Sequence, residues 1–187
     1  MQLMNLERDG MEHGYWIDYE NVTLRPLNIE DIENLRVWRN EPKNTRYLSK
    51  IPFITKEMQA EWFERYLDNK DEICFAIVEN QVLKRMVGSL SLHEFARDTC
   101  FLGKILIGDV EAHGRKVGVN ASIAATKIAF DQLNIHTVNL HVFKNNTIAI
   151  KVYKEAGFAV VDEYETDRDS IECLMTKNRR NTNAQHE

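Results

Sequence analysis

Apolar and polar positions alternate along this chain with two different periods, one typical of strands and one typical of helices. Residues 136–143 alternate strictly, with Val138, Leu140 and Val142 on one side, as in a strand with one buried face. Residues 99–107 are apolar on nearly both sides, which predicts a central strand of a sheet. Five further runs resemble strands: 22–27, 73–79, 85–94, 158–165 and 170–177. The last two of these are expected to form a closing hairpin.

Four segments show the spacing of amphipathic helices. The first covers residues 29–40 and ends there because the residue before Pro42 avoids the helical region. The second follows Thr55, whose hydroxyl is a suitable N-cap. The other two cover residues 115–132 and 147–156. Strands and helices are therefore interspersed, which predicts a mixed α/β domain.

Composition places the chain among ordinary globular proteins. Its 187 residues are enough for one domain with a core, and 43% are hydrophobic and 28% charged. The periodic segments all lie within residues 20–177, so we expect a single domain there, a loose lead-in over 1–19 and a disordered tail over 178–187. The net charge of −5 argues against a nucleic-acid partner.

Location and redox state follow from the same composition. No apolar run reaches membrane-spanning length, and the first residues are too polar for a signal peptide, so we expect a cytoplasmic protein without a membrane partner. Cys74, Cys100 and Cys173 lie in apolar runs without metal-ligand spacing. They are expected to be reduced core residues, and no metal site is predicted.

A glycine-bearing basic turn separates the predicted central strand from the long helix. It reads His113-Gly114-Arg115-Lys116-Val117-Gly118. Free backbone N–H groups and positive charge at a helix start favour phosphate binding. An ordinary strand-to-helix turn is the alternative, since short glycine motifs recur by chance.

The segment LHVFKNNTIAIKVYKEAGF, which ends at Phe158, makes the pattern more specific. Together with the basic turn it resembles the GCN5-related N-acetyltransferase (GNAT) family, whose members show Asn, Ala, Tyr and Gly-Phe at this spacing. The matching residues here are Asn146, Ala149, Tyr153, Gly157 and Phe158. The resemblance covers about residues 20–177. It implies an acetyl-CoA-dependent N-acetyltransferase with a mostly antiparallel sheet of about six or seven strands, about four helices and a splayed central strand pair.

The resemblance also implies a cofactor site. The central strand at Ile105, Leu106 and Ile107 would pair with the pantetheine arm, and a backbone N–H near Leu106 would stabilise the oxyanion. Tyr153 would protonate the leaving thiolate, without a covalent intermediate. In the basic turn His113 replaces the Arg or Gln of the family and Lys116 replaces a glycine. The remaining residues expected at the cofactor are Gly114, Arg115, Val117, Gly118, Asn146 and Ala149.

A base must remove a proton from the acceptor ammonium. Glu94 is the catalytic candidate by its position at the end of the strand before the central one. His93, beside it, and His141, on the polar side of its strand, are the other candidates, and both are also expected near the substrate. A chain of waters is a further alternative.

The acceptor site is expected between the first two helices. Residues 35–50 are locally basic, which suits an anionic acceptor. Arg39 or Arg46 would contact phosphate, and Trp38 or Tyr47 could stack on a base or a sugar. The same segment resembles the branch of the family that acts on UDP-linked 4-amino sugars in pseudaminic acid biosynthesis, and this is the favoured acceptor.

Several alternatives stay open. The chain also resembles spermidine acetyltransferases and acetyltransferases of protein N-termini, including ribosomal ones. A non-catalytic acyl-CoA-binding module is an alternative of another class, supported by Lys116 in the glycine position. A different acyl donor is compatible with the sequence. A homodimer through sheet edges or the terminal hairpin would be unsurprising for the family, although nothing in this chain requires one.

Overall fold

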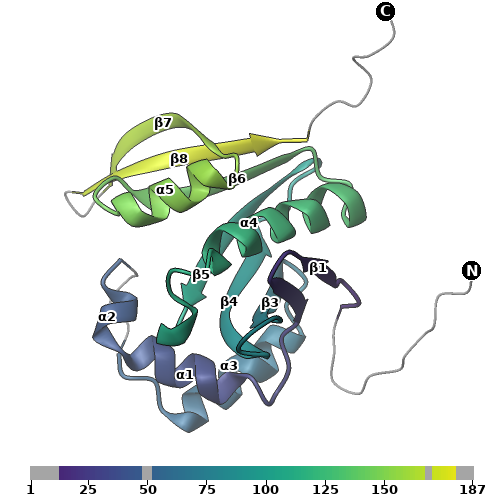
Figure 1. Ribbon diagram of the computed structural model, residues 1–187, viewed down its shortest axis with the longest axis vertical. Helices are drawn as coiled ribbons and strands as arrows, with labels where there is room; N and C mark the ends of the chain where they lie inside the picture. The colour runs from purple at the N-terminus through teal and green to yellow at the C-terminus, as the bar shows by residue number, and fades with distance from the viewer. Residues whose placement is uncertain (1–12, 48–51, 167–169, 180–187) are drawn as a thin grey trace, which may run out of the picture.

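The computed structural model describes residues 13–47, 52–166 and 170–179. Within these ranges eight strands form one sheet in the order β1-β2-β3-β4-β5-β6-β8-β7 (Figure 1). Neighbouring strands are antiparallel except for β5 and β6, which are parallel. The strands are β1 (Ile17–Tyr19), β2 (Val22–Pro26), β3 (Glu72–Glu79), β4 (Arg85–His93), β5 (Thr99–Ile107), β6 (Thr137–Phe143), β7 (Ala159–Thr166) and β8 (Ser170–Asn178).

Within the described residues five α-helices accompany the sheet, and one of them continues into a π-helical turn. They are α1 (Ile32–Asn40), α2 (Pro42–Thr45), α3 (Lys56–Leu67), α4 (Val117–Lys127), which runs on as the π-helix at Ile128–Gln132, and α5 (Thr147–Glu155). No helix among the described residues is long and apolar enough to span a membrane.

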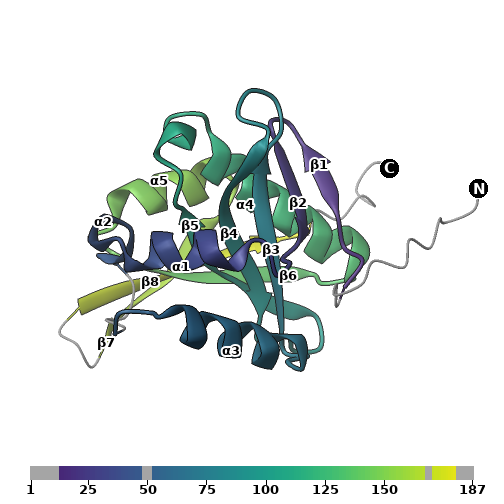
Figure 2. The same ribbon diagram turned by 90° about the horizontal axis from the view of Figure 1, so that it is seen from below.

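Helices cover both faces of the sheet, and strand β3 shows why. Its alternate residues belong to two separate cores: Phe75 and Ile77 pack with α4, whereas Cys74 and Ala76 pack with α1 and α3. Figure 1 shows α4 crossing the face of the sheet to which Phe75 and Ile77 belong, with α5 beside β6 and β8. Figure 2 shows α3 on the opposite face. The period-2 pattern of the strand thus becomes two layers of helices around one sheet.

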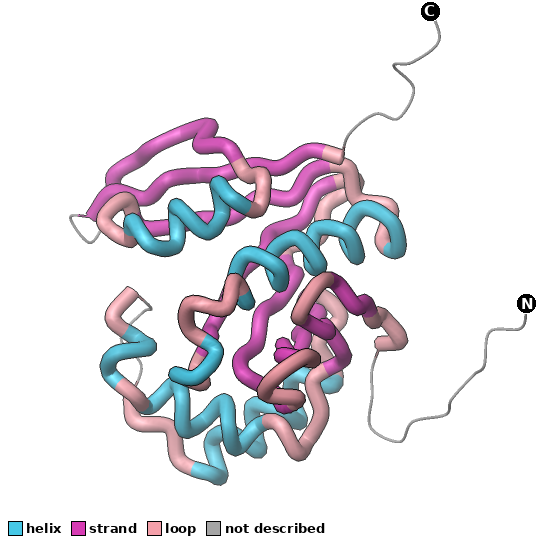
Figure 3. Tube along the Cα trace, viewed as in Figure 1, coloured by secondary structure: helices cyan, strands magenta, loops and turns pink. Residues whose placement is uncertain are grey.

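The central strands β5 and β6 diverge soon after they meet. They pair only between Thr99–Phe101 and Thr137–Asn139, and the rest of each strand follows its own half of the sheet (Figure 3). The expected splayed pair is therefore present. The divergence coincides with a β-bulge on β5, where Ser89 pairs with Leu106 and Ser91 with Gly103, so that β5 carries one extra residue.

Residue Lys104 lies in this bulge with a φ of +53°, in the left-handed region. One class of bulge uses a residue in this left-handed conformation, and glycine is its usual choice. Gly88 on β4 lies next to the bulged part of β5, and a Cβ added at Gly88 would collide with the carbonyl oxygen of Leu106. The small residue on β4 therefore makes room for the bent strand β5.

The predicted strands and helices are confirmed, with differences at their edges, among them the first helix, which begins at Ile32 rather than at residue 29. The sheet begins at Ile17, inside the predicted lead-in, because β1 folds back on β2 through a two-residue turn, with Tyr19 opposite Val22. This strand makes the sheet eight-stranded rather than six- or seven-stranded. The short helix α2 was not predicted, and β8 extends one residue into the predicted tail, to Asn178. Residues 1–12 and 180–187, the rest of the lead-in and tail, lie outside the described residues.

Helix α1 is fixed to the sheet by a buried ion pair. Asp31 is 4% exposed and accepts hydrogen bonds from both terminal nitrogens of Arg25, at 2.6 and 2.7 Å. The same carboxylate accepts from the backbone N–H of Asn28 at 2.9 Å. The first turn of α1 is thus tied to β2, which fixes the direction of the helix.

All three cysteines are free and buried, as expected. Burial raises the pKa of Cys100 to about 12 and also raises the pKa values of Cys74 and Cys173. These thiols are therefore protonated at neutral pH and poor nucleophiles.

Candidate active site

The basic turn before α4 contains two residues with left-handed backbone. Gly114 has a φ of +76° and Lys116 a φ of +59°. The predicted helix start at Arg115 is wrong by two residues, because Lys116 is left-handed and α4 begins at Val117. A left-handed position explains why relatives of the family carry glycine there, since glycine adopts this conformation without steric cost.

The side chain of Lys116 is directed to helix α5. Its Nζ lies 2.9 Å from Oε1 of Glu155. A lysine at this position thus leaves the turn in the conformation that a glycine would adopt. Close by, a Cβ added at Gly118 would lie 3.5 Å from Cγ1 of Val152, so the first turn of α4 also packs against α5. The basic turn and the helix that carries Tyr153 are direct neighbours.

Replacing Lys116 with glycine is expected to raise the free energy of unfolding by about 0.5–1 kcal/mol. The left-handed conformation costs a side-chain-bearing residue roughly 1–2 kcal/mol, and the exposed ion pair with Glu155 returns only about 0–1 kcal/mol. Urea denaturation measures the difference. A loss of stability instead would mean that the ion pair contributes more than an exposed pair normally does.

Other contacts shape the same turn from two sides. Nε2 of His113 lies 3.2 Å from the carbonyl oxygen of Ile107, at the end of β5. Nδ2 of Asn21, in the turn between β1 and β2, donates to the carbonyl oxygen of Arg115 at 2.9 Å. Its Oδ1 accepts from Nδ2 of Asn120 at 2.7 Å. Sequence reasoning missed Asn21, because it lies in a hairpin that is distant from the turn along the chain.

Tyr153 lies on α5, next to this turn. The helix begins at Asn146, whose Oδ1 accepts from the backbone N–H of Ala149 at 3.2 Å, and stops at Gly157, with a φ of +92°. The ring of Tyr153 packs edge-on against Phe158, with 6.1 Å between centroids. Burial raises the pKa of Tyr153 to about 12. Its phenol therefore keeps its proton at neutral pH, as a general acid requires.

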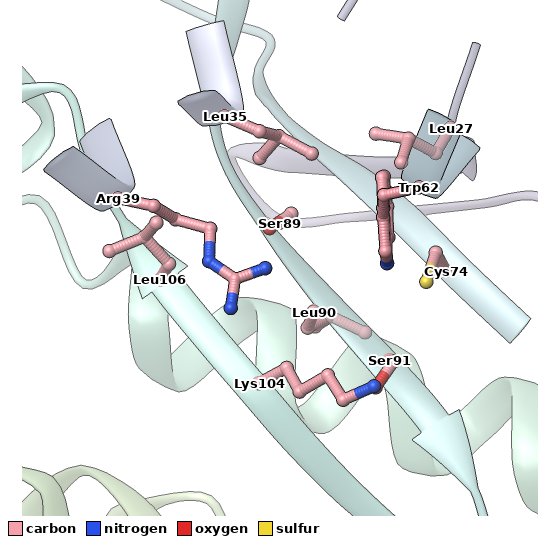
Figure 4. Close-up of a pocket in the computed structure, with 10 residues that line it drawn as sticks. All are labelled: Leu27, Leu35, Arg39, Trp62, Cys74, Ser89, Leu90, Ser91, Lys104 and Leu106. Atoms are coloured by element: carbon pink, nitrogen blue, oxygen red, sulfur yellow. The ribbon is translucent and has the colours of Figure 1, made fainter. Parts of the chain in front are cut away.

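A cavity of about 220 Å³ lies on the other face of the sheet, between β3, β4, β5 and the helices α1 and α3. Its walls are largely apolar, and Arg39 and Lys104 bring positive charge to it (Figure 4). Arg39 extends its guanidinium into the cavity, with Trp62 and Cys74 across from it. The residues lining the cavity are Leu27, Leu35, Arg39, Trp62, Cys74, Ser89, Leu90, Ser91, Lys104 and Leu106.

The two cations of this cavity differ in their partners. Lys104 binds both carboxylate oxygens of Glu72, at 2.6 and 2.7 Å. Burial acts to raise the pKa of Glu72, but the hydrogen bond and charge of Lys104, with smaller contributions from Ser91 and Cys74, together lower it. Arg39 forms no ion pair with any residue in the described ranges. Its charge is therefore available to a ligand.

Residues 21–159 match a family described as "Acetyltransferase (GNAT) domain", which covers most of the described fold. The chain is a GNAT acetyltransferase. GNAT enzymes transfer acetyl groups from acetyl-CoA, so acetyl-CoA is the cofactor of this enzyme. The gap between β5 and β6, with the helix-start turn at its side, suits this cofactor: β5 is unpaired beyond Phe101 on the side of β6, so its backbone can pair with a ligand strand.

Curated relatives share about a quarter of their residues with the chain. Acetyltransferase PseH of Campylobacter jejuni is 24% identical over 137 residues, which are 73% of this chain and 82% of the relative. The spermidine N(1)-acetyltransferase of Escherichia coli is 25% identical over 143 residues, which are 76% of this chain and 75% of the relative.

Solved structures confirm the GNAT fold. Spermidine N-acetyltransferase from Vibrio cholerae, in complex with CoA and spermine, has a TM-score of 0.74 and 21% identity, over 84% of this chain and 95% of that one. An aminoglycoside acetyltransferase in complex with coenzyme A has a TM-score of 0.71 and 17% identity, over 84% and 95%.

Four residues of the segment 35–50 were expected at the acceptor, and three of them, Trp38, Arg46 and Tyr47, are not among the residues lining the cavity. Trp38 packs on Gly108, where an added Cβ would collide with the indole. The guanidinium of Arg46 lies 5.0 Å above the ring of Tyr47, and neither residue is among those lining the cavity. Of the four, Arg39 alone is in the wall.

His93, Glu94 and His141 lie near Phe101, where β5 and β6 still pair, and none of them is among the residues lining the cavity. Nδ1 of His93 is 3.3 Å from Oε1 of Glu94. The ring of Phe101 stacks between His93 and His141, at centroid distances of 6.2 and 5.0 Å. Nδ1 of His141 is 2.6 Å from the hydroxyl oxygen of Tyr164. The three expected residues are thus brought to one region, although Glu94 itself is 70% exposed.

Two residues of the cavity were missed by sequence reasoning although the sequence contains a signal for each. Trp62 belongs to the apolar stripe of α3 and reads as a core residue, but it also faces the cavity. Lys104 is a single charge within an apolar strand, and such a charge in a central strand indicates a bulge or a site. Its meaning depends on the bulge, which periodicity does not reveal.

Proposed function

We propose that this enzyme acetylates the amine of a nucleotide-linked amino sugar, with a UDP-linked 4-amino sugar as the favoured acceptor. One observation carries the proposal: Arg39, which forms no ion pair with any described residue, extends its guanidinium into the cavity that β3, β4 and β5 line. A guanidinium binds phosphate oxygens in a bidentate manner. An acceptor that joins a diphosphate to an amino sugar matches both the charge and the mixed apolar and polar wall.

A polyamine acceptor suits this cavity less well. A polycation needs carboxylates along its path, and here the carboxylate of Glu72, beside the first cavity, is neutralised by Lys104. Arg39 would in addition repel a second ammonium group. Spermidine is therefore the weaker candidate, although a spermidine acetyltransferase is among the relatives.

The main argument for a non-catalytic acyl-CoA-binding module was Lys116 in the glycine position, and the conformation of Lys116 removes this argument. Lys116 adopts the left-handed conformation of the family's glycine, and its side chain is held by Glu155, so it does not distort the turn. The membership of the chain in an acetyltransferase family supports an enzyme.

The residues of the chain have the following roles in this proposal. Acetyl-CoA supplies the acetyl thioester, and the turn from His113 to Gly118 would hold its phosphates with backbone N–H groups and the charge of Arg115. The backbone of Ile105, Leu106 and Ile107 would pair with its pantetheine arm, and Leu106 would offer the N–H for the oxyanion. Tyr153 holds the proton that the leaving sulfur takes up.

The amine must lose a proton before it can attack. Burial lowers the pKa of His93, against the opposing effect of the Glu94 carboxylate, so its imidazole is neutral at neutral pH and can accept a proton. We assign the base to His93, with Glu94 on Nδ1 holding the ring so that Nε2 faces Gly103 on β5. Water within the cavity would connect Nε2 to the amine.

Replacing Arg39 with methionine is expected to raise KM for a UDP-linked 4-amino sugar about 10- to 100-fold, with a small effect on kcat. The estimate follows from the loss of charge-assisted hydrogen bonds worth about 1.5–3 kcal/mol. Steady-state thiol release measures it, with Arg97→Met as the control because Arg97 is an exposed loop residue. The panel also contains spermidine, an aminoglycoside and N-terminal peptides. Faster turnover of any of these than of the nucleotide sugar would overturn the proposed acceptor.

A further inference from the structure

A second cavity, of about 260 Å³, adjoins the acceptor cavity on the side of α3. The two cavities share Arg39 and Trp62 in their walls, so they meet at these side chains. Each is smaller than the roughly 300–1,000 Å³ of a typical small-molecule site, and together they reach that range. An acceptor that extends past Arg39 would therefore enter the second cavity.

This second cavity contains a buried donor without a partner. Gln59 lines it and is 3% exposed, and its Nε2 has no hydrogen-bond partner within the part of the chain that the structure describes. An unsatisfied buried donor costs about 1–3 kcal/mol, so such groups are rare unless a ligand or water completes them. The Gln59 amide, without a partner among the described residues, is therefore the group in this wall that an oxygen atom of a ligand would complete.

The walls of the cavity are held in place from both sides. The indole of Trp62 stacks on the ring of Tyr66, with 5.7 Å between centroids and 11° between planes. On the opposite side the side chain of Asn40 binds the backbone of Ile54 twice, at 2.9 Å each, as donor and as acceptor. The cavity thus combines a fixed aromatic surface with a fixed loop wall, the arrangement of a preformed site.

We infer that this cavity is the subsite for the planar, carbonyl-bearing base of the acceptor, which is uracil in the proposed function, with Gln59 donating to a ring carbonyl. The chemistry of the walls selects this part of the molecule. Trp62 offers a surface for stacking, and an uncharged amide donor pairs well with a neutral carbonyl. Arg39, at the junction, lies where the phosphates would connect the base to the sugar in the first cavity.

The charged residues at the rim do not favour a cationic ligand instead. Arg65 and Glu61 both line the cavity, but they lie 4.0 Å apart and are 71% and 67% exposed, so they largely offset each other in solvent. Arg39 then leaves the combined site with excess positive charge. The subsite is part of the proposed function, whose acceptor it would complete.

The test is calorimetric titration of UDP, and of inorganic pyrophosphate as a probe without a base, into the enzyme and its Gln59→Met variant. The variant is expected to bind UDP about tenfold more weakly and pyrophosphate with unchanged affinity, the loss of one hydrogen bond from a desolvated site. It should fold normally, because it removes an unsatisfied donor, and its melting temperature checks this. Glu64→Gln, at an exposed position of α3 outside both cavities, is the matched control.

Each result decides a separate point. Equal UDP affinity in the wild type and the Gln59→Met variant overturns the subsite, even if the enzyme acetylates a UDP-linked amino sugar. Weaker UDP binding by the variant, without acetylation of that sugar by the wild type, supports the subsite and refutes the proposed acceptor. Absence of both UDP binding and acetylation in the wild type refutes both.

Discussion

Replacing Tyr153 with phenylalanine is expected to lower kcat about 100-fold and to leave KM for acetyl-CoA nearly unchanged. General acids contribute roughly 10²–10⁴-fold, and the lower end applies because a thiolate leaves more readily than an alkoxide. The substitution keeps the aromatic contact with Phe158, so the helix and its packing should remain. Steady-state kinetics with saturating acceptor measures the effect.

Two controls make this result specific. Tyr19→Phe removes a hydroxyl from β1, the edge strand four strands away from β5, and should leave kcat unchanged. The pH profile is the second control, because the pKa of Tyr153 is raised to about 12. The phenol therefore stays protonated throughout the usual assay range, and no alkaline loss of activity should come from it. A Tyr153→Phe variant with more than half of the wild-type kcat would show that another group protonates the sulfur.

Replacing Asp31 with alanine is expected to lower the free energy of unfolding by about 3 kcal/mol. Removal of one partner from a buried ion pair costs about 3–5 kcal/mol, and the lower end applies because the Arg25 side chain is 21% exposed. Three hydrogen bonds to the carboxylate are lost as well, two from Arg25 and one from Asn28. The melting temperature should fall by about 6–12 °C for a domain of this size.

A double variant distinguishes two causes of this instability: the loss of the Arg25–Asp31 ion pair and the charge of Arg25 left without its partner. Arg25→Met combined with Asp31→Leu removes both charges, and buried pairs replaced in this way are often neutral in stability. It should therefore recover most of the loss seen with Asp31→Ala. If both variants were equally unstable, the shape of the first turn of α1 would matter more than the charge. Because α1 carries Arg39, the single variant should also raise KM for the acceptor.

The sequence was sufficient where the fold depends on local periodicity. The strict alternation at Val138, Leu140 and Val142 predicted β6, and all three residues are buried there. Turn and cap chemistry was equally direct: Thr55 caps α3 and Gly157 ends α5, each through a conformation or hydrogen bond that its side chain determines. These features need only neighbouring residues, so a linear pattern contains them.

The acceptor cavity could not be predicted in the same way. Its wall combines Arg39 from α1, Trp62 from α3 and Lys104 from β5, which meet only after the sheet and both helices have packed. Gln59 looks like an ordinary helix residue in the sequence, and only the folded structure shows that its amide has no partner among the described residues. Motif spacing therefore indicates candidate residues on the side of the basic turn and Tyr153, which lie in one stretch of sequence, whereas the wall of the acceptor cavity has no such linear pattern.

The short pairing of β5 with β6 has a consequence for the stability of the whole molecule. Strands β1 to β5 and strands β6 to β8 are joined within the sheet by the three residue pairs between β5 and β6. The sheet therefore consists of two halves with a short junction. A ligand that pairs with the free edge of β5 would extend this short junction between the two halves of the sheet. By mass action, any ligand that binds only the folded chain adds RT ln(1 + [L]/Kd) to its stability. The resistance of this enzyme to unfolding therefore follows the supply of its cofactor.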